Sequence, residues 1–186
     1  MIDALLQADL RLSQWVVSRV GQSDFGMGIS LILAEVLIVF CFMPLVYLWF
    51  KPQPVSARHG NKKAVMLALL SVVFCLALKV ILSALWFRAR PFVADPSLLL
   101  FPLSVDPASF PSAHAMLAFT VGASFWFSGV KQLGGWLLLL ALLIAMGRVM
   151  VGVHFPLDVL AGAIFGAGVA YLLHRESSSI KQYLPN

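Results

Sequence analysis

The sequence predicts an all-α membrane protein, a polytopic bundle of five transmembrane helices preceded by an amphipathic interfacial helix. Of the 186 residues, 61% are hydrophobic and only 11% are charged, and the mean hydropathy is +0.93. A soluble domain of this size could not bury so much apolar surface and keep a wettable exterior. The apolar residues also gather in long stretches. Lipid is therefore the expected solvent for most of the chain.

Residues 1–22 predict an amphipathic helix that lies in the plane of the membrane interface. Apolar residues recur at roughly helical spacing between Ile2 and Val20, and they alternate with polar residues such as Asp3, Asp9 and Arg19. A polar face opposite an apolar face favours an interfacial helix over a spanning one. The two aspartates also interrupt the stretch, which is not typical of a cleavable signal.

Five apolar stretches are expected to cross the bilayer, which takes about 20 residues at a rise of about 1.5 Å per residue. They cover approximately residues 25–50, 64–87, 112–127, 134–151 and 156–174. The third and fourth are short, so we expect them to have little tilt or to lie where the bilayer is thinned. Because no stretch is left for a separate soluble module, residues 1–186 are predicted to form a single domain.

Basic residues are distributed unequally between the two ends of the predicted spans. One end carries Lys51, Arg58, Lys62, Lys63, Lys131, Arg175 and Lys181, and the other, apart from the arginines of the candidate site, carries Arg11 and Arg19. By the positive-inside rule the lysine-rich loops face the cytoplasm. The links at 88–111 and around His154 then share the opposite, outer face.

Composition disfavours two other kinds of site. A net charge of +5 could suit nucleic acid, but the basic residues form no stripe with interleaved aromatic residues. Cys41 and Cys75 lie inside apolar runs and are interpreted as buried thiols. The Cys and His residues also lack the spacing that is typical of zinc sites, so no metal and no other cofactor is predicted.

Three short polar clusters fall on the predicted outer face. They contain Arg88, Arg90 and Pro91; Pro111, Ser112, Ala113 and His114; and Arg148, His154 and Asp158. In the second cluster, Pro111 and Ser112 predict a helix start with Ser112 as the N-cap. The free backbone N–H groups of a helix N-terminus, at the positive end of the helix dipole, would suit an anion. His114, in the same turn, could donate or accept a proton.

The third cluster pairs a histidine with a carboxylate at the start of the last predicted helix, where Pro156 suits the first turn. Asp158, four positions after His154, could accept a hydrogen bond from one imidazole nitrogen and leave the other with a free lone pair. Arg90 and Arg148 supply planar cations that suit phosphate oxygens. Together the clusters predict a phosphoryl-transfer site.

Each cluster also has a simpler interpretation. Arg88 at a helix end could anchor the protein at the headgroup layer. His114 could be an interfacial histidine beside a helix cap, and His154 with Asp158 could form a local structural hydrogen bond. Catalysis is favoured because all three clusters occur on one face.

These residues resemble the signature of the type-2 phosphatidic acid phosphatase superfamily of membrane lipid phosphatases. Its Arg-Pro, Pro-Ser-x-His and Arg-x5-His-x3-Asp motifs are matched at residues 90–91, 111–114 and 148–158. The resemblance implies that His154 attacks phosphorus to form a phosphohistidine, that Asp158 orients it and that His114 protonates the leaving oxygen. No metal would be required. The phosphoryl group would be held by Arg90, Arg148, Ser112 and the adjoining Ala113.

Two positions depart from the superfamily pattern. A lysine often lies seven residues before the first-motif arginine, where this chain has Ser83. Lys79, one turn earlier on the same face, could reach the phosphate or instead pair with Glu35, the lone carboxylate of the first predicted span, and Arg88 could supply the missing charge. The serine that usually precedes the third-motif arginine is Gly147, so one phosphate contact is expected to be absent.

Within the superfamily, residues 86–93, 109–114 and 151–158 are similar to the bacterial undecaprenyl-pyrophosphate phosphatases associated with bacitracin resistance. The short chain and the glutamate in the first span are similar too. This implies hydrolysis of undecaprenyl pyrophosphate to undecaprenyl phosphate at the periplasmic or extracellular face of the bacterial inner membrane, which recycles the lipid carrier of cell-wall synthesis.

Two alternatives stay open. One is a phosphatase for another membrane lipid: phosphatidylglycerophosphate, phosphatidic acid or lipid A phosphate. The other is a non-catalytic lipid-binding or transport protein, although simple binding would need cations and no oriented imidazole.

Overall fold

The computed structural model describes residues 2–52, 55–101 and 106–183, with side chains for residues 4–52, 60–101 and 106–177. The side chains of Arg58 and Lys181, which entered the orientation argument, lie outside these ranges. The helices are α1 (Ile2–Val20), α2 (Asp24–Leu31), η1 (Ile32–Val36), α3 (Leu37–Phe50), α4 (Val55–Leu85), α5 (Pro91–Ala94), η2 (Pro96–Leu98), α6 (Ala113–Phe127), α7 (Lys131–Met150) and α8 (Pro156–Tyr183).

The helical membrane bundle that the sequence predicts is confirmed. In the described part of the chain, four helical stretches are long and apolar enough to cross a membrane: Asp24–Phe50, Gly60–Leu85, Lys131–Met150 and Pro156–Ser177. The remaining predicted span corresponds to the shorter apolar helix α6, Ala113–Phe127. Helix α4, which contains most of the predicted span 64–87, runs from Val55 to Leu85, and its first turns are polar.

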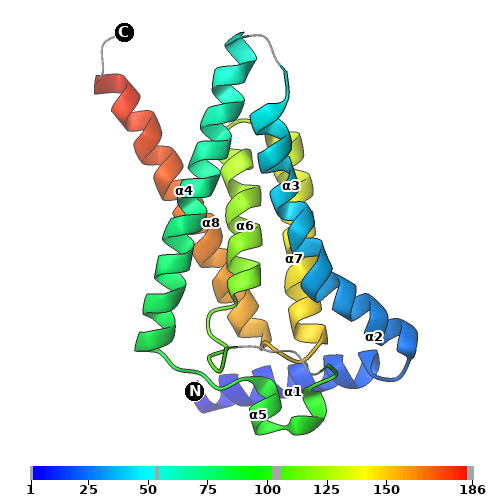
Figure 1. The fold of residues 1–186 in the computed structure, drawn as a ribbon. Helices are drawn as coiled ribbons and strands as arrows, with labels where there is room; N and C mark the ends of the chain where they lie inside the picture. Colours follow the sequence, from blue (N-terminus) through cyan, green and yellow to red (C-terminus); the bar gives the residue numbers. More distant parts are fainter. Residues whose placement is uncertain (1, 53–54, 102–105, 184–186) are drawn as a thin grey trace.

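Helix α6 occupies the centre of the bundle and packs against α4, α7 and α8 (Figure 1). Nine of its fifteen residues are buried, including Met116, Val121 and Phe125. The hydrophobic core on one side of α6 joins residues of α3, α4 and α7, among them Leu45 and Leu137. Surrounded by longer helices, α6 can be short because it has little contact with lipid.

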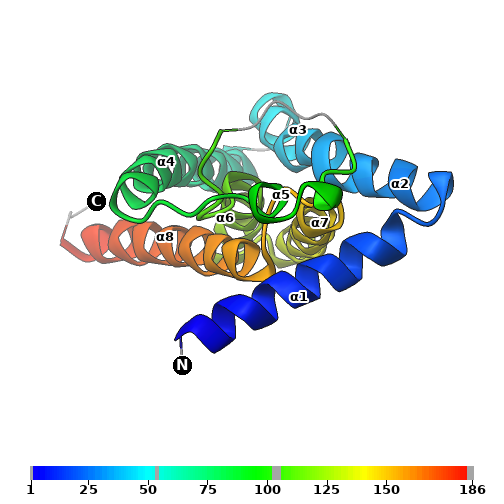
Figure 2. The ribbon, with the colours of Figure 1, turned by 90° about the horizontal axis from the view of Figure 1, so that it is seen from below.

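Helix α1 lies across one end of the bundle rather than through it (Figures 1 and 2). The short helix α5 lies at the same end, and the C-terminal end of α8 lies at the opposite end. Leu5, Leu6, Leu12 and Trp15 of α1 are exposed, whereas Val17 is buried. This arrangement fits the interfacial helix predicted from residues 1–22, whose apolar side chains would enter the headgroup layer.

Glycines allow the central helices to approach closely. A Cβ atom at Gly166 of α8 would lie 2.2 Å from the carbonyl oxygen of Met116 in α6, and one at Gly162 would lie 2.7 Å from that of Ser112. On the other side of α6, a Cβ atom at Gly122 would lie 2.9 Å from the backbone nitrogen of Leu138 in α7. Small residues at such positions are the common means of packing membrane helices.

Replacing Gly166 with alanine should therefore destabilise the protein. The new methyl group would overlap the Met116 carbonyl, so we expect a loss of about 1–3 kcal/mol in the free energy of unfolding. Gly168→Ala is the matched control, since no atom lies within 4 Å of its added Cβ. That variant should be neutral or gain up to about 1 kcal/mol from helix propensity. Unfolding in mixed micelles of increasing denaturing detergent measures both, and equal stability of the two variants would contradict the packing argument.

Candidate active site

A polar cavity of about 210 Å³ lies at the end of the bundle that α1 and α5 cover. It is lined by Lys79, Arg90, Asp106, Ala108, Pro111, Ala113, His114, Arg148 and His154. Members of all three polar clusters therefore meet in one small space, although they are far apart in the sequence. Cations and imidazoles around a cavity of this size suit a phosphoryl group.

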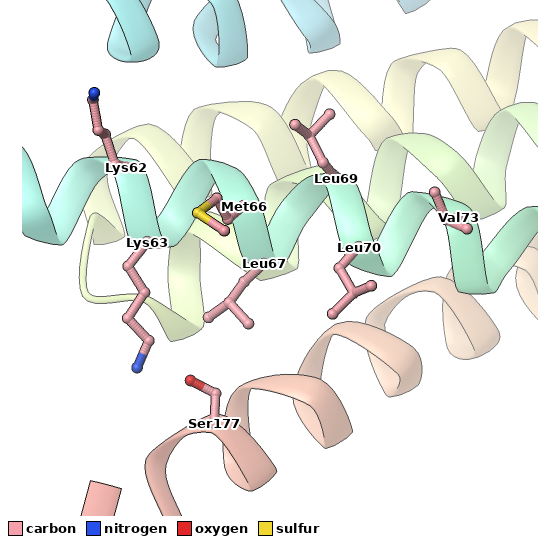
Figure 3. A pocket seen from close by; sticks show the side chains of 8 residues that line it. All are labelled: Lys62, Lys63, Met66, Leu67, Leu69, Leu70, Val73 and Ser177. Carbon is pink, nitrogen blue, oxygen red and sulfur yellow. The ribbon is translucent and has the colours of Figure 1, made fainter. Parts of the chain in front are cut away.

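A larger hollow, of about 830 Å³, lies between α4 and α8 (Figure 3). Its lining is mostly apolar and includes Met66, Leu67 and Leu70, with Lys63 and Ser177 on either side of the gap. These residues belong to the first half of α4 and the distal part of α8, at the end away from α5 (Figure 1). Size alone does not identify the reaction site, because the imidazoles and arginines line the smaller cavity.

Arg90 is held in the cavity wall by main-chain oxygens. It is the extended residue directly before α5, where Pro91 takes the first helical position, and its side chain is buried. Its Nη1 donates to the carbonyl oxygen of Val153 at 2.8 Å, and its Nε donates to that of Asp106. Burial lowers the pKa of Arg90 to about 10, and the nearby Arg148 adds to this effect. The group therefore stays cationic at neutral pH.

His154 lies in the tight turn between α7 and α8, and only 3% of its surface is exposed. The turn depends on Gly152, whose φ of +77° is a conformation that side chains disfavour. A Cβ atom there would also lie 1.8 Å from the carbonyl oxygen of Leu98. The close approach of these two segments fixes the backbone that carries His154.

The contacts of His154 assign its tautomer. Its Nε2 lies 3.4 Å from Nη1 of Arg90, and its Nδ1 lies 3.8 Å from Oδ2 of Asp158. A guanidinium group has only donors, so the nitrogen beside Arg90 must carry the lone pair. The proton is then on Nδ1, facing the carboxylate, although 3.8 Å is longer than a hydrogen bond. Burial lowers the pKa of His154 to about 4, so the ring is neutral at physiological pH.

Asp158 is completely buried and is held by two donors. Its Oδ2 accepts from the backbone N–H of Phe155 at 2.9 Å, and its Oδ1 accepts from Nη1 of Arg88 at 2.7 Å. Its carbonyl oxygen accepts from the backbone N–H of Ser112 at 3.1 Å. Asp158 therefore joins the second and third clusters through its backbone and faces His154 with its side chain.

Glu35, Arg148 and His114 form a second ionic group on the other side of the cavity. Nη1 of Arg148 donates to Oε1 of Glu35, and Oε2 of the same carboxylate lies 3.8 Å from Nε2 of His114. Glu35 is placed by η1, a π-helical turn within the first span. Glu35 thus contacts Arg148 and faces His114, whereas Lys79 pairs with Asp106.

Ser112 is the N-cap of α6, as predicted, but its hydroxyl caps no backbone group. Its backbone N–H donates to the carbonyl oxygen of Asp158 at 3.1 Å, and the adjoining Ala113 lines the cavity. Among the described residues, the buried atoms without a hydrogen-bond partner include Ser112 Oγ, Arg148 Nε and His154 Nδ1. Of these, Arg148 lines the cavity and Ser112 lies at the start of α6, where both could donate to an anion.

Lys79 reaches the cavity, but its ammonium group is paired with Asp106. Its Nζ lies 2.6 Å from Oδ2 of Asp106, and Lys79 lowers the pKa of that carboxyl. Ser83, at the position where the superfamily often has lysine, donates to the carbonyl oxygen of Phe110 at 3.0 Å. This serine therefore supports the segment that precedes the second cluster. Asp106 itself had no signal in the sequence.

Arg88 is not placed as expected. Its guanidinium does not line the cavity; it bridges Asp158 and Asp9 and lies 3.8 Å from the centre of the Phe155 ring. Asp9 was expected on the polar face of an interfacial helix, yet only 5% of it is exposed. Sequence reasoning missed its role because an aspartate among polar residues of an amphipathic helix normally faces water.

The sequence profile described as the PAP2 superfamily matches residues 64–179, more than half of the chain. The chain belongs to this superfamily. The matched residues hold all three clusters, whereas Asp9 and Glu35 lie outside them. Within the described residues, no group of three or more His, Cys, Asp or Glu side chains could hold a metal ion.

Known proteins of this PAP2 type cover most of the chain. Undecaprenyl-diphosphatase BcrC of Bacillus subtilis (strain 168) is 28% identical over 157 residues, which are 84% of this chain and 78% of that protein. The crystal structure of Aquifex aeolicus LpxE has a TM-score of 0.66 at 23% identity and covers 89% of this chain and 94% of its own.

A PAP2-type phosphatidylglycerolphosphate phosphatase from Bacillus subtilis has a TM-score of 0.65 at 24% identity, with 97% of this chain and 90% of that chain covered. By its superfamily and its similarity to undecaprenyl-diphosphatases, the present chain is a membrane lipid phosphatase, a hydrolase. The predicted superfamily, fold class and enzyme class are confirmed, and the non-catalytic alternative is disfavoured.

The depressed pKa of His154 can be measured directly. Ring ¹⁵N chemical shifts of histidine-labelled protein in detergent should show one imidazole that titrates near pH 4, because burial penalises its cation. His154→Gln should remove that signal and so assign it. A His154 ring that titrates at or above about 6.5, the ordinary value, would contradict the buried and unprotonated state.

Proposed function

We propose that this PAP2 phosphatase hydrolyses undecaprenyl pyrophosphate to undecaprenyl phosphate and inorganic phosphate through a phosphohistidine at His154. The observation that carries the proposal is the lone pair of His154 Nε2, 3.4 Å from Arg90, in the wall of a phosphate-sized cavity. A neutral, positioned imidazole is a competent nucleophile. The name of the Bacillus subtilis relative supports the choice of lipid.

In the first step, Nε2 of His154 attacks the terminal phosphorus. An N–P bond forms while the bond between that phosphorus and the bridging oxygen breaks. Protonated His114 gives its proton to the leaving oxygen, so undecaprenyl phosphate departs. The phosphorylated ring keeps the proton on Nδ1 and gains a positive charge, which the Asp158 carboxylate, 3.8 Å away, stabilises.

In the second step, water replaces the imidazole. Neutral His114 accepts a proton from the water as its oxygen bonds to phosphorus, and the N–P bond breaks with its electron pair returning to Nε2. Inorganic phosphate leaves, and His114 is again protonated for the next turnover. His114 thus serves as the general acid in the first step and as the general base in the second.

Arg90 and Arg148 stabilise the charge on the phosphoryl oxygens in both steps. Positioned cations in a site shielded from water usually make the largest contribution to the rate enhancement of phosphoryl transfer. Arg148 Nε and Ser112 Oγ, which are buried without partners in the described structure, are suitable donors for the oxygens of the bound phosphate. Ala113 adds a backbone contact at the start of α6.

We place this reaction at the periplasmic or extracellular face of the bacterial inner membrane. The cavity lies at the end of the bundle that carries α1 and α5, whereas Lys62, Lys63 and Lys131 belong to the other end (Figure 1). The positive-inside rule assigns the lysine-bearing end to the cytoplasm.

A second candidate substrate is phosphatidylglycerophosphate. The structure of a phosphatase named for that lipid covers 97% of this chain with a TM-score of 0.65. The polar cavity binds the phosphoryl group that both lipids share, so the apolar part of the substrate must decide between them.

Loss of His154 should abolish turnover, whereas loss of His114 should reduce kcat by about 10²–10⁴-fold. The reason is that one residue forms the covalent bond and the other only transfers protons. Phosphate release from undecaprenyl pyrophosphate in detergent, with EDTA present, measures both. Acid-labile ³²P should be trapped on the wild type and absent from His154→Gln.

His174 provides a matched control, because it lies in the distal part of α8, away from the cavity. His174→Gln should keep wild-type activity. Near wild-type turnover of His154→Gln would show that another residue is the nucleophile. Activity that disappears on chelation would show that a metal takes part.

Lipid preference should separate the two candidate substrates. We expect kcat/KM to be highest for undecaprenyl pyrophosphate when phosphatidylglycerophosphate, phosphatidic acid and lipid A phosphate are assayed in the same mixed micelles. Inorganic pyrophosphate serves as the control without a lipid chain. A preference for phosphatidylglycerophosphate would retain the chemistry and reject the polyprenyl substrate.

A further inference from the structure

Asp9 is a buried carboxyl group that the proposed reaction does not use. It lies in α1, outside the residues matched by the superfamily profile, and is only 5% exposed. Neighbouring Leu5, Leu6 and Leu12 on the same helix are more than 40% exposed. Burying a carboxylate is costly unless it is paired and hydrogen-bonded, so its burial requires an account.

The partners of Asp9 all come from the catalytic end of the protein. Its Oδ2 lies 2.6 Å from Nη2 of Arg88, and its Oδ1 accepts from the backbone N–H of Leu157 at 3.1 Å. Leu157 is in the first turn of α8, directly before Asp158. Asp9 therefore contacts both the residue next to Asp158 and the cation that binds Asp158.

Arg88 connects the two carboxylates through separate nitrogens. Nη1 binds Asp158 at 2.7 Å while Nη2 binds Asp9, and the guanidinium lies over the Phe155 ring at 3.8 Å. The planar fork of arginine suits this double pairing, which a lysine could not reproduce. Each carboxylate thus helps to fix the position in which Arg88 holds the other.

The net charge of Asp9, Arg88 and Asp158 affects the nearby ring of His154. Asp158 and Arg88 alone would cancel, which would leave His154 without a net negative neighbour on that side. Asp9 adds one negative charge, so the group of Asp9, Arg88 and Asp158 carries a net charge of −1. The other titratable or charged groups around His154 are Arg90, Arg148 and His114, two of which are permanent cations that oppose a positive charge on the ring.

We propose that Asp9 is a positioning residue of the active site, which acts through Arg88 to orient Asp158 and to restore negative charge beside His154. The proposal rests on the phosphohistidine reaction set out above. It makes the N-terminal interfacial helix a part of the catalytic apparatus. The exposed apolar side chains of α1, such as Leu5 and Leu12, would face lipid, while the buried carboxylate of Asp9 supports the nucleophile.

The test is Asp9→Asn, which keeps the shape and removes the charge. We expect kcat to fall about 10- to 100-fold, the usual effect of losing an outer partner that orients a functional histidine. KM should stay unchanged, because Asp9 does not line the cavity. In the ¹⁵N titration, the ring of His154 should titrate at lower pH than in the wild type, since its cation has lost a stabilising charge.

Asp24→Asn is the charge-matched control, because Asp24 is exposed at the start of α2. It should match the wild type in kcat and in the titration of His154. Wild-type kcat for Asp9→Asn would overturn the proposal. So would a fall in kcat that only follows a loss of folded protein and leaves the titration of His154 unchanged, since that is the result of a purely structural role.

If Asp9→Asn does not fold, Asp9→Glu replaces it. The longer side chain keeps the charge but cannot hold Arg88 and Leu157 at the same distances, so kcat should fall at constant KM, and wild-type kcat would overturn the proposal. His154→Gln separates this outcome from a failure of the proposed reaction. If His154→Gln is active, the proposed reaction is wrong. If His154→Gln is inactive and Asp9→Asn is fully active, the reaction stands and only the proposed role of Asp9 is wrong.

Discussion

The ion pairs of Arg88 are the interaction on which the candidate site depends. This guanidinium binds Asp9 and Asp158, which are 149 positions apart in numbering yet meet at one cation. A buried carboxylate without a partner would be strongly unfavourable, so the three side chains must be assembled together or not at all. Their assembly attaches α1 to the start of α8 and brings Arg88, in the segment after α4, into contact with both helices. Because Arg88 also covers the Phe155 ring, the same contact restrains the turn that carries His154.

Close backbone contacts supply the precision that ion pairs alone cannot. Gly162 lets α8 approach the start of α6 so closely that a Cβ atom there would lie 2.7 Å from the Ser112 carbonyl oxygen. Because the two helices lie so close together, the backbone N–H of Ser112 can donate to the carbonyl oxygen of Asp158. The second and third motifs are consequently fixed to each other through main-chain atoms, which do not change rotamer. Side-chain geometry at His154 and His114 is thus built on a rigid base, as positioning for phosphoryl transfer requires.

The sequence predicted what depends on periodicity and local chemistry. Apolar stretches predicted the helices to within a few residues, except where the polar ends of α4 and α8 extend beyond the apolar part. The motif residues Arg90, His114, Arg148 and His154 do line one cavity. Pairing of charges over long distances could not be predicted. Arg88 was a candidate for the phosphate or for the headgroup layer, and Asp9 was placed on the polar face of an interfacial helix, yet they bind each other across 79 positions. Lys79 likewise had two candidate partners, and the structure pairs it with a third, Asp106, in a loop without periodicity.

The pairing of the cavity cations determines how a phosphate can bind and leave. Arg148 is already bound to Glu35 and Lys79 to Asp106, so a phosphoryl group must compete with a carboxylate for each of them. Arg90 differs, because the hydrogen bonds that fix it come from the carbonyl oxygens of Asp106 and Val153, which leave its positive charge uncompensated by direct contact with an anion. It is also the cation next to Nε2 of His154, which favours it as the anchor of the phosphoryl group in the proposed reaction. In the proposed reaction, the carboxylates paired with the other two cations would weaken the binding of inorganic phosphate, which must depart before the next lipid can enter.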